Sequence, residues 1–249
     1  MSGHSKWATI KHAKGKTDAA RGKVFNRIIR EITVAAKMGG GIVENNPRLR
    51  SAVAAAKDAN MPGKNIENAI AKGTGTLEGV TYEEFTLEGY GPGGVAIICE
   101  VMSDNRNRTV SEVRHVFTKG GGNLGSSNSV AYMFNSKGII RIAKSAKDED
   151  ALMEIVLEAG AEDMSSEGDD YEVTSALESF EAVKTTLDKF GIKPISAELT
   201  KIPETLVKLE GDAAQKALRI FDALDDLDDT QHVYANFDIS DADLALYHS

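Results

Sequence analysis

Residues 138–166, GIIRIAKSAKDEDALMEIVLEAGAEDMSS, change from the hydrophobic pattern of a strand to that of a helix and back. Apolar runs of strand length alternate here, and in the residues that follow, with longer segments of helical period. The predicted elements are, in order, strand 138–144, helix 148–159, strand 161–166, strand 171–175, helix 179–190 and strand 195–199. This βαββαβ order is that of a ferredoxin-like unit, so we predict such a domain over 137–200.

The segments on either side of this unit also read as mixed strands and helices. A glycine-proline turn, GPGG at 91–94, separates two strand-like runs, and a helical pattern follows it. The expected elements are strands 83–90 and 94–102, helix 107–119, strand 129–134, strand 205–209, helix 212–227 and strand 231–237. We therefore predict one discontinuous α/β domain, built from 79–136 plus 201–249, into which 137–200 is inserted.

The first 78 residues have a different, helical pattern. A helix is expected from Thr17 to Met38, with one apolar and one basic face, and GGG at 39–41 should end it. Asn46 is placed to cap the next helix and Pro47 to open it, and a short third helix should run to Gly73. The last two helices, joined by a tight turn, could form a helix-turn-helix-like unit. The predicted fold is thus α+β and multidomain, a small N-terminal helical domain at 1–78 followed by two ferredoxin-like α/β domains, one inserted in the other.

Charge is distributed unevenly along the chain. The formal net charge is −9, yet residues 1–78 hold 14 basic and 6 acidic side chains, a net of +8, so the remainder carries −17. Residues 103–145 form a second basic stretch, with seven basic and two acidic side chains. A basic front and an acidic rear suggest a directed encounter with a polyanion, while solvated charged faces without a partner remain the alternative.

Several function classes are disfavoured by the sequence. No apolar run approaches the roughly 20 residues that cross a bilayer, and we expect a cytoplasmic protein with no membrane partner. Cys99 lies alone in an apolar strand, the histidines show no metal-ligand spacing, and no nucleophile motif is present. The GPGG turn lacks the Lys-Ser/Thr of a phosphate loop and leads into a strand, so a hairpin turn is favoured over a nucleotide site. We expect no catalytic residue, no metal and no cofactor, with an enzyme as a distant third hypothesis.

The basic stretch around the 107–119 helix leaves two interpretations open. Arg106 and Arg108 should project from the first turn of this helix, with Arg114 farther along. Cations at a helix N-terminus oppose the macrodipole by roughly 0.3 to 1 kcal/mol each, so their placement needs a compensating partner. That partner is either a phosphate of a bound nucleic acid or the neighbouring carboxylates. Asp222–Asp229 form an acidic run at the end of the 212–227 helix, which is interpreted as a solvated helix end, with a site for a metal ion or a basic protein as the alternative.

Four long motifs carry a family resemblance. They are GHSKWATIKHAKGKTDAARGKVF at 3–25, PRLRSAV at 47–53, EGYGPGG at 88–94 and DNRNRTVSEVRHVFTKGGGNLG at 104–125. They resemble, almost letter for letter, the YebC family, whose mitochondrial members include the translational activator of cytochrome oxidase subunit I. The similarity extends to DDLDDTQHVYANFDIS at 225–240 and so covers essentially the whole chain. It implies three domains, no catalytic residues, and either DNA-binding transcriptional regulation, as described for bacterial relatives, or action on the ribosome, as in organelles.

Two hypotheses about function follow from the residues and the resemblance. In the first, the protein is a DNA-binding transcriptional regulator. It binds phosphates through its basic N-terminal arm, the segment before the first predicted helix, and through that helix. The third helix presents Lys64, Asn65 and Asn68 to base edges. In the second, a translation activator docks on ribosomal RNA through the arm and the arginines of the 107–119 helix. Both use a monomer. The candidate nucleic-acid-binding residues are Lys6, Lys11, Lys14, Lys16, Arg21, Lys23, Arg27, Arg30, Lys64, Asn65, Arg106, Arg108 and Arg114.

Overall fold

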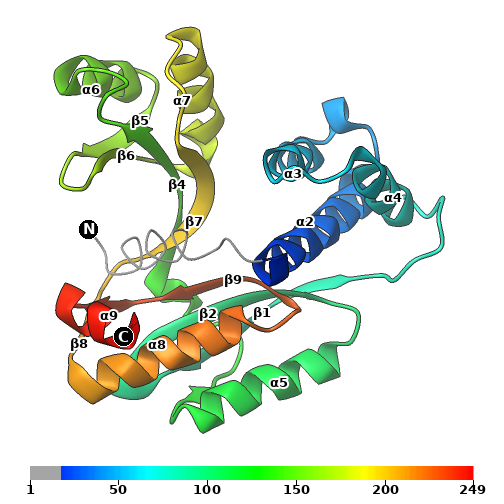
Figure 1. The fold of residues 1–249 in the computed structure, drawn as a ribbon, viewed down its shortest axis with the longest axis vertical. Helices are drawn as coiled ribbons and strands as arrows, with labels where there is room; N and C mark the ends of the chain where they lie inside the picture. Colours follow the sequence, from blue (N-terminus) through cyan, green and yellow to red (C-terminus); the bar gives the residue numbers. More distant parts are fainter. Residues whose placement is uncertain (1–17, 249) are drawn as a thin grey trace. The chain divides into compact units, whose positions relative to one another are not determined.

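The computed structural model describes the backbone of residues 18–248 and the side chains of residues 22–247 (Figure 1). Tyr132–Leu206 forms one compact unit, and the described residues before it, together with those from Val207 onward, form the other. One continuous segment of chain is therefore flanked by two segments that fold together.

The unit at 132–206 has the predicted βαββαβ order. Its elements are β4 (Phe134–Ala143), α6 (Glu149–Glu158), β5 (Ala161–Ser165), β6 (Asp170–Ser175), α7 (Leu177–Lys189) and β7 (Ser196–Pro203). The strands lie side by side in the order β5-β6-β4-β7, and every neighbouring pair is antiparallel. Both helices pack on one face of the sheet, where Ile140, Val156, Val173 and Leu187 are fully buried. This strand order is the ferredoxin-like one that the sequence pattern indicated.

β4 differs from the prediction, because the sequence pattern indicated two strands separated near Gly138. The structure has a 3-10 turn, η3 (Ala131–Met133), and then a single strand through Gly138. A Cβ atom at this glycine would overlap the ring of Phe180 on α7, and it would lie 2.6 Å from the Oγ of Ser175. Gly138 is therefore explained by the close approach of α7 to the sheet, not by a turn.

Three helices, α2 (Asp18–Gly39), α3 (Pro47–Asp58) and α4 (Gly63–Gly73), form the N-terminal region, with η1 (Val43–Asn45) between the first two. α3 and α4 both pack on α2 around Ile32, Leu49 and Ala69 (Figure 1). Asn46 caps α3 as predicted, since its Oδ1 accepts from the Leu49 N–H at 3.0 Å. Its Nδ2 also donates to the carbonyl of Ala35 at 2.8 Å, which fixes the start of α3 against the end of α2.

The remaining elements build a second sheet. They are β1 (Glu83–Tyr90), η2 (Pro92–Gly94), β2 (Ala96–Ser103), α5 (Arg106–Lys119), β3 (Asn123–Leu124), β8 (Val207–Leu209), α8 (Gly211–Asp225), β9 (Thr230–Ala235), β10 (Phe237–Ile239) and α9 (Asp241–His248). The strand order is β3-β1-β2-β9, with β8 and β10 forming a separate parallel pair. This sheet begins with the β1-β2 hairpin and so departs from the βαβ start of the other unit.

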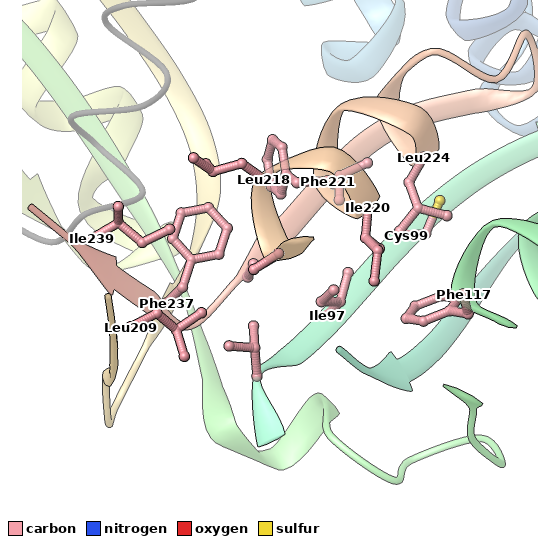
Figure 2. Close-up of a cluster of buried hydrophobic side chains, with 14 of the residues drawn as sticks. Ile97, Cys99, Phe117, Leu209, Leu218, Ile220, Phe221, Leu224, Phe237 and Ile239 are labelled. Carbon is pink, nitrogen blue, oxygen red and sulfur yellow. The ribbon is translucent and has the colours of Figure 1, made fainter. Parts of the chain in front are cut away.

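α5 and α8 cover one face of this sheet. Figure 2 shows Ile220 and Leu224 of α8 lying over Ile97 and Cys99 of β2, with Phe117 of α5 beside them, and all five side chains are essentially buried. Burying one large apolar side chain contributes about 1.5 to 3 kcal/mol, so this shared core holds the segments from before and after residues 132–206 together.

A buried carboxylate organises the loop after β3. Glu88 on β1 is 5% exposed, and its oxygens accept from the backbone N–H groups of Asn128, Val130 and Ala131 at 2.7 to 2.8 Å. The hydroxyl of Tyr90 donates to a carbonyl of the same loop. Because a buried carboxylate needs such donors, Glu88 and this loop stabilise each other.

The fold class is confirmed: the chain is α+β, with an N-terminal helical region followed by antiparallel sheet domains. Among the described residues, no helix is both long and apolar enough to span a bilayer.

Candidate nucleic-acid interface

The basic face of α2 is formed by Lys23, Arg27 and Arg30. Their spacings of four and three residues place them on one side of the helix, as the sequence predicts. In the structure this side meets the acidic run at the end of α8. Lys23 Nζ lies 2.8 Å from Oδ1 of Asp226, and an Arg27 terminal nitrogen lies 3.2 Å from Oδ1 of Asp225. These cations are therefore paired with carboxylates of the same chain that lie about 200 positions away in the sequence.

Asp229 is the centre of this contact. Its side chain is 2% exposed, and its Oδ2 accepts from Ser103 Oγ at 2.8 Å, from Thr109 Oγ1 at 2.5 Å and from Arg108 at 2.7 Å. Its Oδ1 lies 3.0 Å from a terminal nitrogen of Arg30. Burial alone raises the pKa of Asp229, but these hydrogen bonds and the Arg30 charge outweigh it and hold the pKa below its ordinary value. Arg30 and Arg108 thus meet at one buried carboxylate.

The first turn of α5 is also occupied by partners within the fold. Arg106 pairs with Glu83 at 2.6 Å, and its guanidinium lies 4.2 Å from the centre of the Phe85 ring. Arg108 donates to Asp104 as well as to Asp229, and both acids raise its pKa above the ordinary value. Of the two interpretations left open above, pairing with neighbouring carboxylates therefore describes these two arginines in the structure.

Arg114 is placed differently, on the exposed side of α5. Within the part of the chain that the structure describes, it forms no ion pair, and the same holds for Lys119, the last residue of the helix. Among the described residues, neither cation is paired with a carboxylate. Both side chains are therefore open to an external anion.

Lys64 and Asn65 lie in the first turn of α4, and both are exposed. Lys64 is 3.7 Å from Glu67, a loose contact between two side chains that are both more than 70% exposed. A pair of this kind contributes little and competes poorly with another partner. The first turn of α4 is thus accessible, as a helix that contacts a nucleic acid from its N-terminal residues must be.

Five of the predicted residues lie outside the described side chains. Lys6, Lys11, Lys14 and Lys16 belong to the segment before residue 18, and Arg21 is described only as part of the α2 backbone. Their assignment to a nucleic-acid contact stays a prediction.

Further exposed cations were not singled out from the sequence. Arg50 and Lys57 are seven residues apart on α3 and therefore share one face of the helix, and Lys72 is exposed near the end of α4. None of the three has an ion pair within residues 22–247, although Arg50 donates to the carbonyl of Glu44. The spacing was visible in the sequence, but which cations lack an acidic partner became clear only from the contacts.

Arg48 is another residue that sequence reasoning missed. It lies on α3, and its guanidinium binds Glu31 of α2 at 2.6 Å and Glu84 of β1 at 3.0 Å. The hydrogen bonds that Arg48 donates to Glu31 and Glu84 raise the pKa of its guanidinium, although burial acts in the opposite direction. Arg48 is a structural clamp between the helices and the second sheet.

The glycine-rich segments are explained by packing. η2 lies between the paired strands β1 and β2, so GPGG forms the hairpin turn that was predicted. A Cβ atom at Gly120 would overlap Ile220, and one at Gly122 would overlap the carbonyl oxygen of Tyr90. The GGG run after α5 therefore allows the end of this helix to approach the hairpin and α8 closely.

No metal or thiol chemistry is indicated by the described residues. They contain no group of three or more His, Cys, Asp or Glu side chains that could hold a metal ion. Cys99 is fully buried and hydrogen-bonded to Thr230, and burial raises the pKa of its thiol to about 12. A thiol so far from ionisation is unreactive at neutral pH.

Comparison with known families assigns both parts of the chain. The family model "TACO1/YebC protein N-terminal domain" matches residues 5–76, and the model "TACO1/YebC second and third domain" matches residues 82–237. The chain belongs to the TACO1/YebC family. The resemblance noted from the motifs is confirmed.

Relatives within the TACO1/YebC family are similar over nearly their full length. A protein of Desulforapulum autotrophicum and one of Koribacter versatilis, both named probable transcriptional regulatory protein, are each 58% identical to this chain. The matches cover 97% and 98% of this chain and 98% of each relative. A crystal structure of a conserved hypothetical protein from Aquifex aeolicus is 48% identical, with a TM-score of 0.82 over 92% of this chain and 94% of that one. The names of the two bacterial relatives place them among regulatory proteins.

Proposed function

We propose that this TACO1/YebC protein is a cytoplasmic, monomeric, nucleic-acid-binding regulator of gene expression, in the first place a DNA-binding transcriptional regulator. The relatives named probable transcriptional regulatory proteins support the regulatory class. The observation that carries the binding itself is the exposed face of α3, where Arg50 and Lys57 have no acidic partner among residues 22–247. In a chain of net charge −9, such cations are the places where a polyanion can be bound.

In this proposal the predicted helical domain, 1–78, makes the main contact. Arg50 and Lys57 bind phosphates, and the arm before residue 18 adds its four lysines. Lys64 and Asn65, in the open first turn of α4, are placed to reach base edges. The contact is mostly electrostatic, so the affinity should fall steeply as salt is raised, by about 0.9 log units per log unit of salt for each phosphate contact.

The test is the binding of a fluorescent 20-base-pair duplex, measured by anisotropy from 50 to 200 mM salt. Arg50→Glu with Lys57→Glu should weaken binding at least tenfold and lower the salt slope by about 2, which corresponds to two phosphate contacts. Lys189→Glu with Lys193→Glu is the matched control, because it changes the net charge equally at two exposed lysines of the 132–206 unit. Equal losses in both variants would refute the assignment of the α3 face.

Ribosomal RNA is the second candidate target. The observation that favours it is the pair of exposed cations on α5, Arg114 and Lys119, which have no acidic partner among the described residues. Exposed cations spread over α3 and α5 suit an irregular RNA backbone better than one straight groove. Sedimentation of lysate with DNase distinguishes the candidates: co-migration with ribosomes that survives DNase supports RNA, and DNase-sensitive retention on chromosomal DNA supports transcription.

A further inference from the structure

The basic face of α2 is covered by acidic groups of the same chain. Asp225, Asp226 and Asp229 each pair with one of its three cations. Two backbone carbonyls of this segment, those of Asp225 and Asp228, also accept hydrogen bonds from Arg27 and Arg30. The α2 cations therefore meet a cluster of carboxylate and carbonyl oxygens, much as they would meet the oxygens of a phosphate backbone.

The position of the aspartates does not stabilise α8 itself. α8 ends at Asp225, and acidic groups at the C-terminus of a helix oppose its macrodipole. The cations of α2 supply the compensation that α8 lacks. The acidic run is thus a counter-charge for α2, which is a role that the local sequence did not reveal.

The three ion pairs differ in depth. Asp226 is 78% exposed and Asp225 is 12% exposed, whereas Asp229 is 2% exposed and also bound by Arg108. Exposed pairs exchange readily with other counter-ions, and buried pairs do not. The outer end of the contact, at Asp226, can therefore open first and the less exposed pair at Asp225 after it, while Asp229 keeps its partner on α5.

Arg27 also retains an unused donor. Its Nε is buried and has no hydrogen-bond partner within the described residues, although its terminal nitrogens bind Asp225. A guanidinium carries five N–H donors in a fixed fork that suits a phosphate. The acidic end of α8 leaves part of this capacity unused.

We propose that the acidic end of α8, at Asp225 and Asp226, competes within the molecule with nucleic-acid phosphates for the basic face of α2. The competition rests on the proposed function, since a polyanion must bind. When it binds this face, α2 separates from the end of α8, and Lys23 and Arg27 exchange carboxylates for phosphates. Only an anion that binds Lys23 and Arg27 more strongly than Asp225 and Asp226 do can therefore displace the acidic segment, and weak or isolated anions do not.

The first experiment uses a double variant that carries both Asp225→Asn and Asp226→Asn. Its affinity is compared with that of the wild type, for the same 20-base-pair duplex and for a single-stranded RNA of equal length. The variant should bind about tenfold more tightly at 100 mM salt, and its salt slope should steepen by about 2 as two cations become available to phosphates. Asp226→Asn alone, at the more exposed position, gives a variant whose folding is not in question and should show part of the gain.

The matched control is Glu210→Gln with Asp212→Asn, at the opposite end of α8. Both side chains are exposed and pair with nearby lysines, Lys208 and Lys216, so the net charge changes by the same amount without affecting α2. Equal tightening in both double variants, or none in the Asp225 and Asp226 variant, would overturn the competition while leaving nucleic-acid binding intact. If none of the proteins bound either nucleic acid, the proposed function would fail instead.

A distance measurement tests the separation directly. Spin labels at Asn26→Cys on α2 and Lys216→Cys on α8 occupy exposed positions that do not pair with Asp225, Asp226 or Asp229, and the native Cys99 is fully buried. Saturating duplex should lengthen the distance between the labels, and the Asp225 and Asp226 variant should show part of that change without nucleic acid. An unchanged distance at saturation would contradict the proposal.

Discussion

Replacing Asp229 by Asn should destabilise the protein strongly, because this buried carboxylate accepts three hydrogen bonds and also forms an ion pair with Arg30. Ser103, Thr109 and Arg108 donate to Oδ2, and Arg30 approaches Oδ1. An Asn side chain has nearly the same shape, but one of its two terminal atoms is an NH₂ group. Whichever way the amide turns, it points donors at donors on one side and leaves the arginine charges less compensated.

The size of the effect follows from burial. Removing one partner of a buried ion pair costs about 3 to 5 kcal/mol. Arg108 is 43% exposed and can be rehydrated, so we expect the lower end, about 3 kcal/mol. For a protein of this length, each kcal/mol lowers Tm by about 2 to 4 °C, which predicts a decrease of about 6 to 12 °C.

The assay is urea unfolding at pH 7, followed by far-UV circular dichroism, with calorimetry for Tm. Asp212→Asn is the control: Asp212 is 79% exposed and pairs with Lys216, so its loss should change the free energy of unfolding by less than about 0.5 kcal/mol. A loss below about 1 kcal/mol for Asp229→Asn would refute the view that Asp229 joins α2 and α5.

Three further predictions follow from the same contacts. The pKa of Asp229 is lower in the folded protein than in the unfolded chain. Its contribution to the free energy of unfolding is therefore complete above the unfolded pKa of about 3.9 and is lost as pH falls through the folded value. In urea titrations from pH 6 to 2, Asp229→Asn should reduce this acid-induced loss of stability. Glu88→Gln should lower the free energy of unfolding by about 2 kcal/mol, because a Gln presents one acceptor oxygen where three N–H groups converge. The same change should accelerate amide hydrogen exchange in the 128–131 loop. Gly120→Ala should lower stability by about 1 to 3 kcal/mol, since the added methyl group overlaps Ile220.

Each of these predictions has its own control. If the Asp229→Asn variant lost as much stability as the wild type when pH is lowered, the titrating group would lie elsewhere. For Glu88→Gln, unchanged exchange in the loop would show that other contacts hold it. Gly63→Ala is the counterpart of Gly120→Ala, because a Cβ at Gly63 meets nothing within 4 Å, so it should be tolerated. Equal Tm values for the two glycine variants would contradict the packing argument.

Elements with strong local signals were predictable from the sequence. The βαββαβ order follows from hydrophobic periods that act over a few residues, and the start of α3 follows from Asn46 and Pro47. Asn105 likewise caps α5 through its contact with the Arg108 N–H. The single strand β4 was not predictable, because the reason for Gly138 is a ring on α7, more than 40 residues away.

The interface divides in the same way. By itself the sequence determined which side chains share a helix face, and so it placed Lys23, Arg27 and Arg30 together on α2. Only the tertiary structure decided which cations have acidic partners, because those partners lie about 200 residues away and Coulomb attraction depends on distance in space, not along the chain. This pairing covers the basic face of α2. Arg50 and Lys57 on α3, by contrast, stay exposed.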